Sequence, residues 1–149
     1  MWARSPFGGH IHTAYAVAVR RCAGVFEWRA HTHSVAHGGS VRVDEWVGME
    51  SAAAQFVVVV VPGIGGSSEQ QYVRALVKEC GEVRGWRVAV FNHRGCGSQA
   101  LTSPHLFTFG DVDDLNVAVR ELARRHPRAK FGMVGCRFVP TTMMRGRTL

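Results

Sequence analysis

The pattern of apolar and polar positions changes partway along the chain, from partial alternation to a continuous apolar run. From Phe26 to Val35 and from Ser40 to Val47 apolar and polar residues partly alternate, and Gly38-Gly39 supplies a turn between the two stretches. These stretches predict an antiparallel β-hairpin. The run from Phe56 to Val61 is continuously apolar and rich in valine, which is typical of a strand buried on both faces of a parallel sheet.

A helix is predicted after this strand. It begins at a capping-box arrangement formed by Ser68, Glu69 and Gln71 and runs to about Cys80-Gly81. Its apolar face consists of residues spaced by three and four, namely Tyr72, Val73, Leu76, Val77 and Cys80. A second strand follows from Trp86 to Phe91, and the polar segment Asn92-His93-Arg94-Gly95 predicts a turn after it.

The next helix is indicated by the charges at its two ends. Acidic residues lie in its first turn and basic residues in its last turns, which suits the helix dipole: Asp111, Asp113, Asp114, then Arg120, Arg124, Arg125. Its buried stripe is predicted to be Leu115, Val119 and Leu122, and Pro127 ends it. A third short strand is predicted from Phe131 to Gly135.

The order strand, helix, strand, helix, strand with short connections is typical of right-handed βαβ crossovers in a parallel sheet. We therefore predict an α/β fold, with the antiparallel hairpin preceding a βαβαβ unit. The 149 residues have the length of one domain, and we expect a boundary at 136, with 1–136 forming part of a hydrolase-type domain and 137–149 a divergent basic tail.

Composition and charge exclude several classes of protein. The formal net charge of +7 is spread thinly along the chain, and no basic stripe is interleaved with aromatic residues, so we expect no nucleic-acid partner. No apolar run has the length of a transmembrane helix, and Arg20-Arg21 follow the apolar segment Ala14 to Val19 where a signal peptide would have its basic residues before it. The expected location is the cytoplasm or a membrane periphery.

The four cysteines argue against a disulfide scaffold or a zinc knuckle. They are far apart in the sequence and form no C-x-x-C pair: Cys22, Cys80, Cys96 and Cys136. His31 and His33, with His37 nearby, could in principle hold a metal, but no carboxylate or cysteine completes the set, so a solvated hairpin edge is favoured.

Three further histidines are predicted to be surface or capping residues rather than catalytic ones: His93, His105 and His126. No metal or other cofactor is expected.

The glycine-rich loop Pro62 to Ser68 is the segment most indicative of chemistry. A phosphate cradle is disfavoured, because the loop has no lysine and matches neither G-x-x-x-x-G-K-[ST] nor G-x-G-x-x-G. A tight turn without function is one alternative. The favoured hypothesis is an oxyanion hole, in which a backbone N–H at Ile64 or Gly65 points at an acyl oxygen.

Several ordered motifs carry a resemblance to a known family. They are Gly9-His10-Ile11-His12-Thr13, then Pro62 to Arg74 as P-G-x-x-x-x-S-x-x-x-Y-V-R, then Asn92 to Gly97 as N-H-R-G-C-G, then Leu101-Thr102-Ser103-Pro104, and then Phe107 to Leu115. Together they are similar to the α/β-hydrolases of the YheT/EMB8 type, the ABHD lipases, and they lean toward the acylglycerol lipase branch. The resemblance covers about residues 6 to 136.

The resemblance implies a serine hydrolase that acts on carboxylic esters, typically monoacylglycerols or other lipid esters, without a cofactor. It also implies a nucleophile elbow after the third strand of the βαβ run, with the acid and the histidine of the triad farther along the chain. Possible peripheral membrane association belongs to the same expectation.

The sequence departs from the family at this elbow. Met133 to Cys136 enters the elbow in phase, but Arg137 occupies the nucleophile position, and the bulky residues after it do not suit a sharp strand-to-helix turn. We expect a fold truncated at the elbow, with the acid and the histidine beyond the C-terminus, and therefore no hydrolysis by this chain. The alternatives are Cys136 as the nucleophile, or a non-catalytic lipid- or protein-binding fragment.

Overall fold

The computed structural model describes residues 26–48, 55–106 and 112–136. The motif at 9–13, the first acidic residue of the predicted second helix, Asp111, and the elbow residue Arg137 lie outside the described residues. The strands of the described part are β1 (Trp28–Ser34), β2 (Ser40–Trp46), β3 (Phe56–Val61), β4 (Arg87–Asn92) and β5 (Lys130–Gly135). The helices are η1 (Ala36–Gly38), α2 (Gln71–Val77), η2 (Lys78–Val83) and α3 (Asp113–Arg125).

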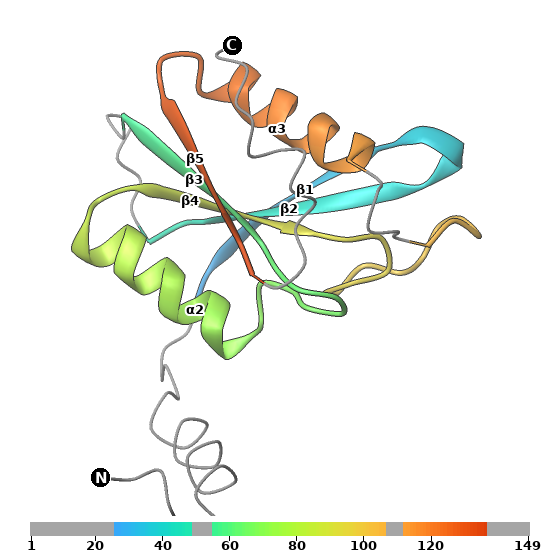
Figure 1. The fold of residues 1–149 in the computed structure, drawn as a ribbon, viewed down its shortest axis with the longest axis horizontal. Helices are drawn as coiled ribbons and strands as arrows, with labels where there is room; N and C mark the ends of the chain where they lie inside the picture. The colour runs from blue at the N-terminus through green and yellow to red at the C-terminus, as the bar shows by residue number, and fades with distance from the viewer. Residues whose placement is uncertain (1–25, 49–54, 107–111, 137–149) are drawn as a thin grey trace, which may run out of the picture.

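The strands form one mixed sheet in the order β1-β2-β4-β3-β5 (Figure 1). The predicted hairpin is confirmed, because β1 pairs antiparallel with β2 from Trp28↔Trp46 to Ser34↔Ser40. β3, β4 and β5 are parallel to one another, as the βαβαβ pattern predicts. The hairpin joins this parallel unit through an antiparallel pairing of β2 with β4.

The two helices cover opposite faces of the sheet, and this explains the unbroken apolar run of β3. Val58 and Val60 pack with Val73 and Val77 of α2, whereas the alternate residues of β3 pack against α3. Residues Val57 to Val61 are all buried. A strand buried on both faces has no position where a polar side chain reaches water, so it lacks alternation.

The first helix starts later than the sequence predicts. α2 begins after Gln70, and no side chain caps its N-terminus. The predicted capping box at Ser68 is wrong, because the Ser68 hydroxyl donates instead to the buried carboxylate of Asp44 on β2, at 2.6 Å. A buried carboxylate that needs donors is a stronger partner for this hydroxyl than the helix end.

The same helix continues as a short π-helix, η2, past the predicted end. Gly81 lies in this segment, and a Cβ there would collide with the Trp46 ring. The glycine therefore lets β2 and the helix approach each other closely.

α3 has the predicted acidic residues in its first turn and basic residues in its last turn. Leu115 and Leu122 are buried and Val119 is half-buried against the same cluster. Asp114 lies in the first turn as predicted, and it is buried. Within the described residues, no helix is long and apolar enough to cross a membrane.

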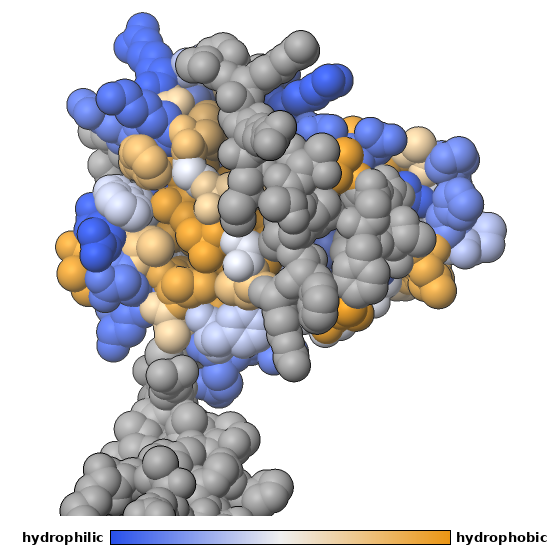
Figure 2. Space-filling model, in the orientation of Figure 1, coloured by the Kyte–Doolittle hydropathy of each residue, from blue (hydrophilic) through white to orange (hydrophobic). Residues whose placement is uncertain are grey.

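β5 is a strand at the border of the described sheet, and it pairs there with β3 alone. Figure 2 shows apolar surface along β5, between α2 and α3, and Met133 on this strand is 39% exposed. The burial of β5 is accordingly incomplete, in contrast to that of β3 and β4.

Candidate functional site

The glycine-rich loop and the end of β5 meet at one edge of the sheet. The loop follows β3, and β5 is parallel to β3, so the carboxyl ends of both strands lie side by side. The Cys136 N–H donates to the Val61 carbonyl at 2.9 Å and fixes this arrangement. In open α/β sheets, ligands bind at this edge.

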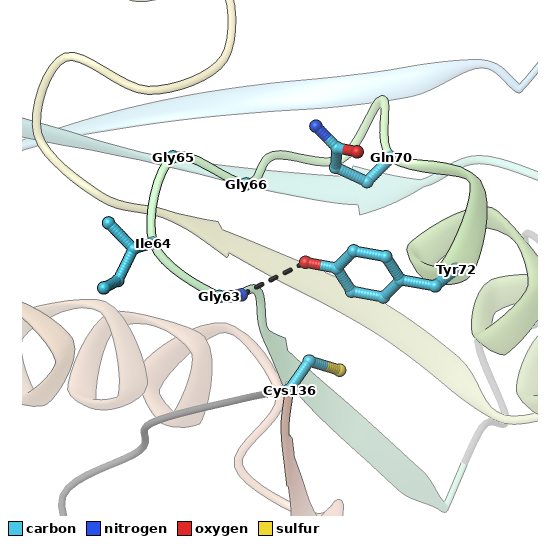
Figure 3. Close-up of a pocket in the computed structure, with 7 residues that line it drawn as sticks. All are labelled: Gly63, Ile64, Gly65, Gly66, Gln70, Tyr72 and Cys136. Atoms are coloured by element: carbon cyan, nitrogen blue, oxygen red, sulfur yellow. Dashed lines mark hydrogen bonds between the residues drawn. The ribbon is translucent and has the colours of Figure 1, made fainter. Parts of the chain in front are cut away.

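A pocket of about 460 Å³ opens between these segments (Figure 3). Four loop residues, Gly63 to Gly66, form one wall. Gln70 and Tyr72 contribute from the start of α2, and Cys136 contributes from the end of β5. Both predicted oxyanion residues, Ile64 and Gly65, line the pocket, whose volume is in the range of small-molecule sites.

The backbone N–H groups of the loop are largely engaged. The Gly63 N–H donates to the Tyr72 hydroxyl at 3.1 Å, and the Gly66 N–H donates to the Gly63 carbonyl at 2.8 Å. A hydrogen bond with the Gly65 backbone lowers the pKa of the Cys96 thiol, although burial of that thiol has the larger, opposite effect. Only a donated bond favours a thiolate, so Gly65 gives its N–H to the sulfur.

Ile64 differs from these neighbours. Its N–H has no protein acceptor within the part of the chain that the structure describes. Ile64 lines the pocket, and the residue as a whole is 62% exposed. Of the two residues named from the sequence, Ile64 has the free donor and Gly65 the occupied one.

The lack of a side chain at Gly66 lets the loop pass close to Tyr72. A Cβ at Gly66 would lie 2.8 Å from the Gly63 carbonyl oxygen, 2.8 Å from the Tyr72 hydroxyl and 2.9 Å from the Pro62 Cβ. These contacts are closer than real Cβ atoms make. Gly65 instead has φ +67° with open space around it, so its requirement is conformational.

A buried polar cluster behind the pocket holds the start of α2 to the sheet. Asp44 accepts from Ser68 Oγ at 2.6 Å, from Asn92 Nδ2 at 2.8 Å and from Arg42 Nε at 2.5 Å. The Asn92 amide oxygen in turn accepts from the Ser68 N–H at 3.0 Å. The cluster thus links β2, the end of β4 and the segment that leads from the loop into α2.

The turn predicted at Asn92 to Gly95 is confirmed, since the Cys96 N–H donates to the His93 carbonyl at 2.9 Å, but its first three residues are buried rather than at the surface. Asn92 is the last residue of β4, and Asn92, His93 and Arg94 are all buried. Arg94 makes a two-bonded ion pair with Asp114 of α3, with Nε to Oδ2 at 2.5 Å and Nη2 to Oδ1 at 2.7 Å. Arg94 Nη2 also donates to the Ala36 carbonyl at 3.0 Å, so one guanidinium joins the hairpin turn to α3.

His93 is buried beneath the glycine-rich loop and is hydrogen-bonded to its first residue, Pro62. Its prediction as a surface residue is therefore wrong. Burial lowers the pKa of His93, while a hydrogen bond with Pro62 and the nearby Asp114 act in the opposite direction. Proline has no N–H, so the His93 ring donates to the Pro62 carbonyl at the first residue of the loop.

Cys136 has few of the properties of a nucleophile. Burial raises the pKa of its thiol, so the thiolate is less available than in an ordinary cysteine. No histidine is among the described residues that line the pocket with it. In Figure 3 the sulfur lies below the Tyr72 ring. Cys80, Cys96 and Cys136 are free thiols.

The hairpin histidines lie at an edge of the described sheet, as predicted, because His31 and His33 belong to its outermost strand, β1; these two are half-buried and His37 is exposed. His31 Nε2 lies 3.3 Å from the buried Glu45 carboxylate, and His126, at the end of α3, lies 3.3 Å from the same group. Burial lowers the pKa of both His31 and His33. His105 contacts the His37 ring edge-on, with the ring centroids 4.5 Å apart. Among the described residues, no group of three or more histidine, cysteine or acidic side chains is placed to hold a metal.

Comparison with known proteins assigns this arrangement to a family. The family model for the α/β hydrolase fold matches residues 57–136, from β3 to the pocket residue at the end of β5. The chain therefore belongs to the α/β-hydrolase fold family, and within it to the ABHD type that its curated relatives represent.

Two of these relatives illustrate how much of the chain is similar. The chain is 36% identical over 87 residues to a monoacylglycerol lipase of Saccharomyces cerevisiae, which covers 58% of this chain and 19% of that protein. It is 30% identical over 132 residues to abhydrolase domain-containing protein 2 of Drosophila melanogaster, with 87% of this chain and 33% of that protein covered. The chain thus spans about a fifth to a third of the length of these relatives.

Solved structures agree on the fold. An α/β serine hydrolase without a lid from Xanthomonas campestris superposes with a TM-score of 0.60 at 24% identity, covering 77% of this chain and 54% of that one. A Pyrococcus furiosus esterase gives a TM-score of 0.58 at 19% identity, covering 74% and 42%. At these levels of sequence identity, the structural similarity shows a shared fold and does not extend to function.

Proposed function

We propose that the chain supplies the carbonyl-binding half of a lipid ester hydrolase site, and that the sequence with Arg137 binds the ester of a monoacylglycerol without cleaving it. The supporting observation is the Ile64 N–H, which has no acceptor among the described residues, in a residue that lines the pocket, whereas the Gly63 and Gly66 N–H groups beside it are hydrogen-bonded. A free backbone donor beside a cavity suits a carbonyl oxygen. The names of the lipase relatives support a lipid ester as the ligand.

The absence of cleavage follows from the residues that the sequence has at the elbow. Arg137 replaces the expected serine, and a guanidinium that remains protonated cannot act as a nucleophile. Cys136 is a poor substitute, since burial disfavours its thiolate. The alternative of a protein-binding fragment lacks an observation of comparable weight.

Two measurements on the 149-residue chain test this proposal. Titration with 1-hexanoylglycerol, followed by calorimetry, is expected to show saturable binding, and chromatography of the mixture is expected to recover the ester intact. Reaction with a fluorophosphonate probe is expected to label no residue. Absence of binding contradicts the ligand assignment, and probe labelling or hexanoate release above the buffer rate contradicts the non-catalytic part.

The cysteine alternative has its own control. The Cys136→Ala variant is expected to bind 1-hexanoylglycerol as the unsubstituted chain does. If the unsubstituted chain releases hexanoate and the variant does not, Cys136 is the nucleophile and the proposal is wrong.

A further inference from the structure

We propose that the phenolic O–H of Tyr72 is a second donor to the ligand's carbonyl oxygen, so that Tyr72 selects ligands that carry a carbonyl. This rests on the proposed function of the pocket. Sequence patterning places Tyr72 on the buried face of its helix, but the structure places its ring at the pocket wall with 40% of the residue exposed. In Figure 3 the ring extends from α2 toward the glycine loop.

The direction of the hydrogen bond at Tyr72 carries the argument. The Gly63 N–H donates to the phenolic oxygen at 3.1 Å, so that oxygen acts as an acceptor toward the loop. A phenol that accepts one bond still has its own proton to donate. Within the described ranges, no protein group accepts the Tyr72 proton. The bond from Gly63 also polarises the O–H and strengthens it as a donor.

The position of the hydroxyl is closely fixed. The bond from Gly63 holds it on one side, and on the other it lies so close to Gly66 that a Cβ there would be 2.8 Å from the phenolic oxygen. A donor held in place in advance loses little freedom when the ligand binds. The hydroxyl is bonded to the N–H of Gly63, whose neighbour Ile64 carries the free N–H, so two donors come from adjoining parts of the pocket.

The lining of the pocket defines the class of ligand. Among the described residues that line the pocket, Gln70 is the other polar side chain, and none is a carboxylate that would attract a cation. Two neutral donors without a charged side chain suit a neutral carbonyl oxygen better than a phosphate. The ester carbonyl of a lipid fits this chemistry.

A matched pair of ligands tests the proposal. 1-Hexanoylglycerol and its ether analogue 1-O-hexylglycerol differ at the carbonyl oxygen, and the chain and its Tyr72→Phe variant are titrated with both. We expect the unsubstituted chain to prefer the ester, and Tyr72→Phe to weaken ester binding by about fivefold to tenfold, the effect of one neutral hydrogen bond. Binding of the ether is expected to stay unchanged.

A spectroscopic readout reports on the phenol itself. The sequence contains two tyrosines, Tyr15 and Tyr72, so 3-fluorotyrosine labelling gives two ¹⁹F signals, and the Tyr72→Phe variant identifies one of them. The signal of Tyr72 is expected to shift when the ester is added and to shift less with the ether.

The outcomes separate this inference from the proposed function. Absence of ester binding, or equal binding of ester and ether by the unsubstituted chain, overturns the proposed function and this inference with it. Preference for the ester that survives in Tyr72→Phe overturns the role of Tyr72 alone. An equal loss of both ligands in the variant shows that Tyr72 only braces the loop and also overturns its role.

Discussion

The hydroxyl of Ser68 donates to the carboxylate of Asp44 at 2.6 Å, and this bond joins the loop ahead of α2 to the middle of β2. The two residues are 24 positions apart, and both are buried. The bond anchors the segment from Ser68 to Gln70, which leads from the candidate site into the helix that carries Tyr72.

Removal of the Asp44 carboxylate is expected to destabilise the fold strongly. The Asp44→Ala variant leaves the partners of that carboxylate, Arg42, Ser68 and Asn92, without their acceptor. Loss of one member of such a buried cluster costs about 3 kcal/mol. Urea denaturation measures the change in unfolding free energy. The exposed Glu82→Gln is the control, expected within about 0.5 kcal/mol, and a similar value for Asp44→Ala would contradict the prediction.

Replacement of Arg94 by lysine is expected to loosen α3 from the hairpin turn. Lysine keeps the charge but cannot make two parallel bonds to Asp114 while it also reaches the Ala36 carbonyl. We expect a loss of about 2 kcal/mol and faster amide exchange in α3 than in α2. Arg128→Lys, at an exposed position, is the matched control. Equal exchange rates in both variants would show that the paired geometry has no special role.

Two glycines of the loop are expected to respond differently to substitution. Gly66→Ala introduces a Cβ that meets the Gly63 carbonyl and the Tyr72 hydroxyl, so it should cost about 2 kcal/mol and abolish ester binding. Gly65→Asn keeps a residue that tolerates positive φ in open space, so it should cost less than about 1 kcal/mol. Denaturation and titration with 1-hexanoylglycerol measure both. The reverse order of effects would contradict the geometry of the loop.

The free energy of unfolding is expected to decrease as the pH is lowered below neutrality. Burial lowers the pKa of His93 from the ordinary 6.5, and burial also lowers that of His31 and His33. The unfolded chain then binds more protons than the folded one as the pH falls below about 6.5, so the free energy of unfolding decreases with the pH. Hydrogen bonds from Arg124 and Arg125 lower the pKa of Glu121 to about 2, so it stays ionised over this range.

Urea midpoints between about pH 7.5 and about pH 5 measure this dependence. The His93→Gln variant keeps a donor for the Pro62 carbonyl and removes one titrating group, so its midpoint should change less with pH than that of the unsubstituted chain. Identical slopes in the two proteins would assign the dependence to other groups.

The strands were predictable because their patterns are local. The alternation on both sides of Gly38-Gly39 and the run from Phe56 to Val61 each record which faces of a strand are buried. The position of the glycine loop at the carboxyl end of β3 followed from the same order of elements. Ile64 and Gly65, predicted from that order, line the pocket, and their role as donors to a carbonyl oxygen stays a prediction.

The errors concern polar residues whose partners are distant in the sequence. Ser68 looks like a helix cap because serine commonly caps helices, and its true partner lies on β2. Asn92 and Arg94 look like turn residues, yet each is buried against a carboxylate, Asp44 or Asp114. A local pattern contains no information on such pairs. The carboxylate Asp44 on the hairpin strand was the one signal that could have indicated a buried cluster.

The sheet order has a consequence for how the chain assembles. Among the described strands, β4 alone pairs with both the hairpin and the parallel unit, because it lies between β2 and β3. Synthesis proceeds from the N-terminus, so the hairpin and β3 are made before the strand that joins them. Until Asn92, the last residue of β4, has been added, no described strand pairs with both the hairpin and β3, and the apolar faces of these segments stay exposed. The described sheet can therefore close only after β4 has been made, and until then the hairpin and β3 both expose apolar surface to other chains.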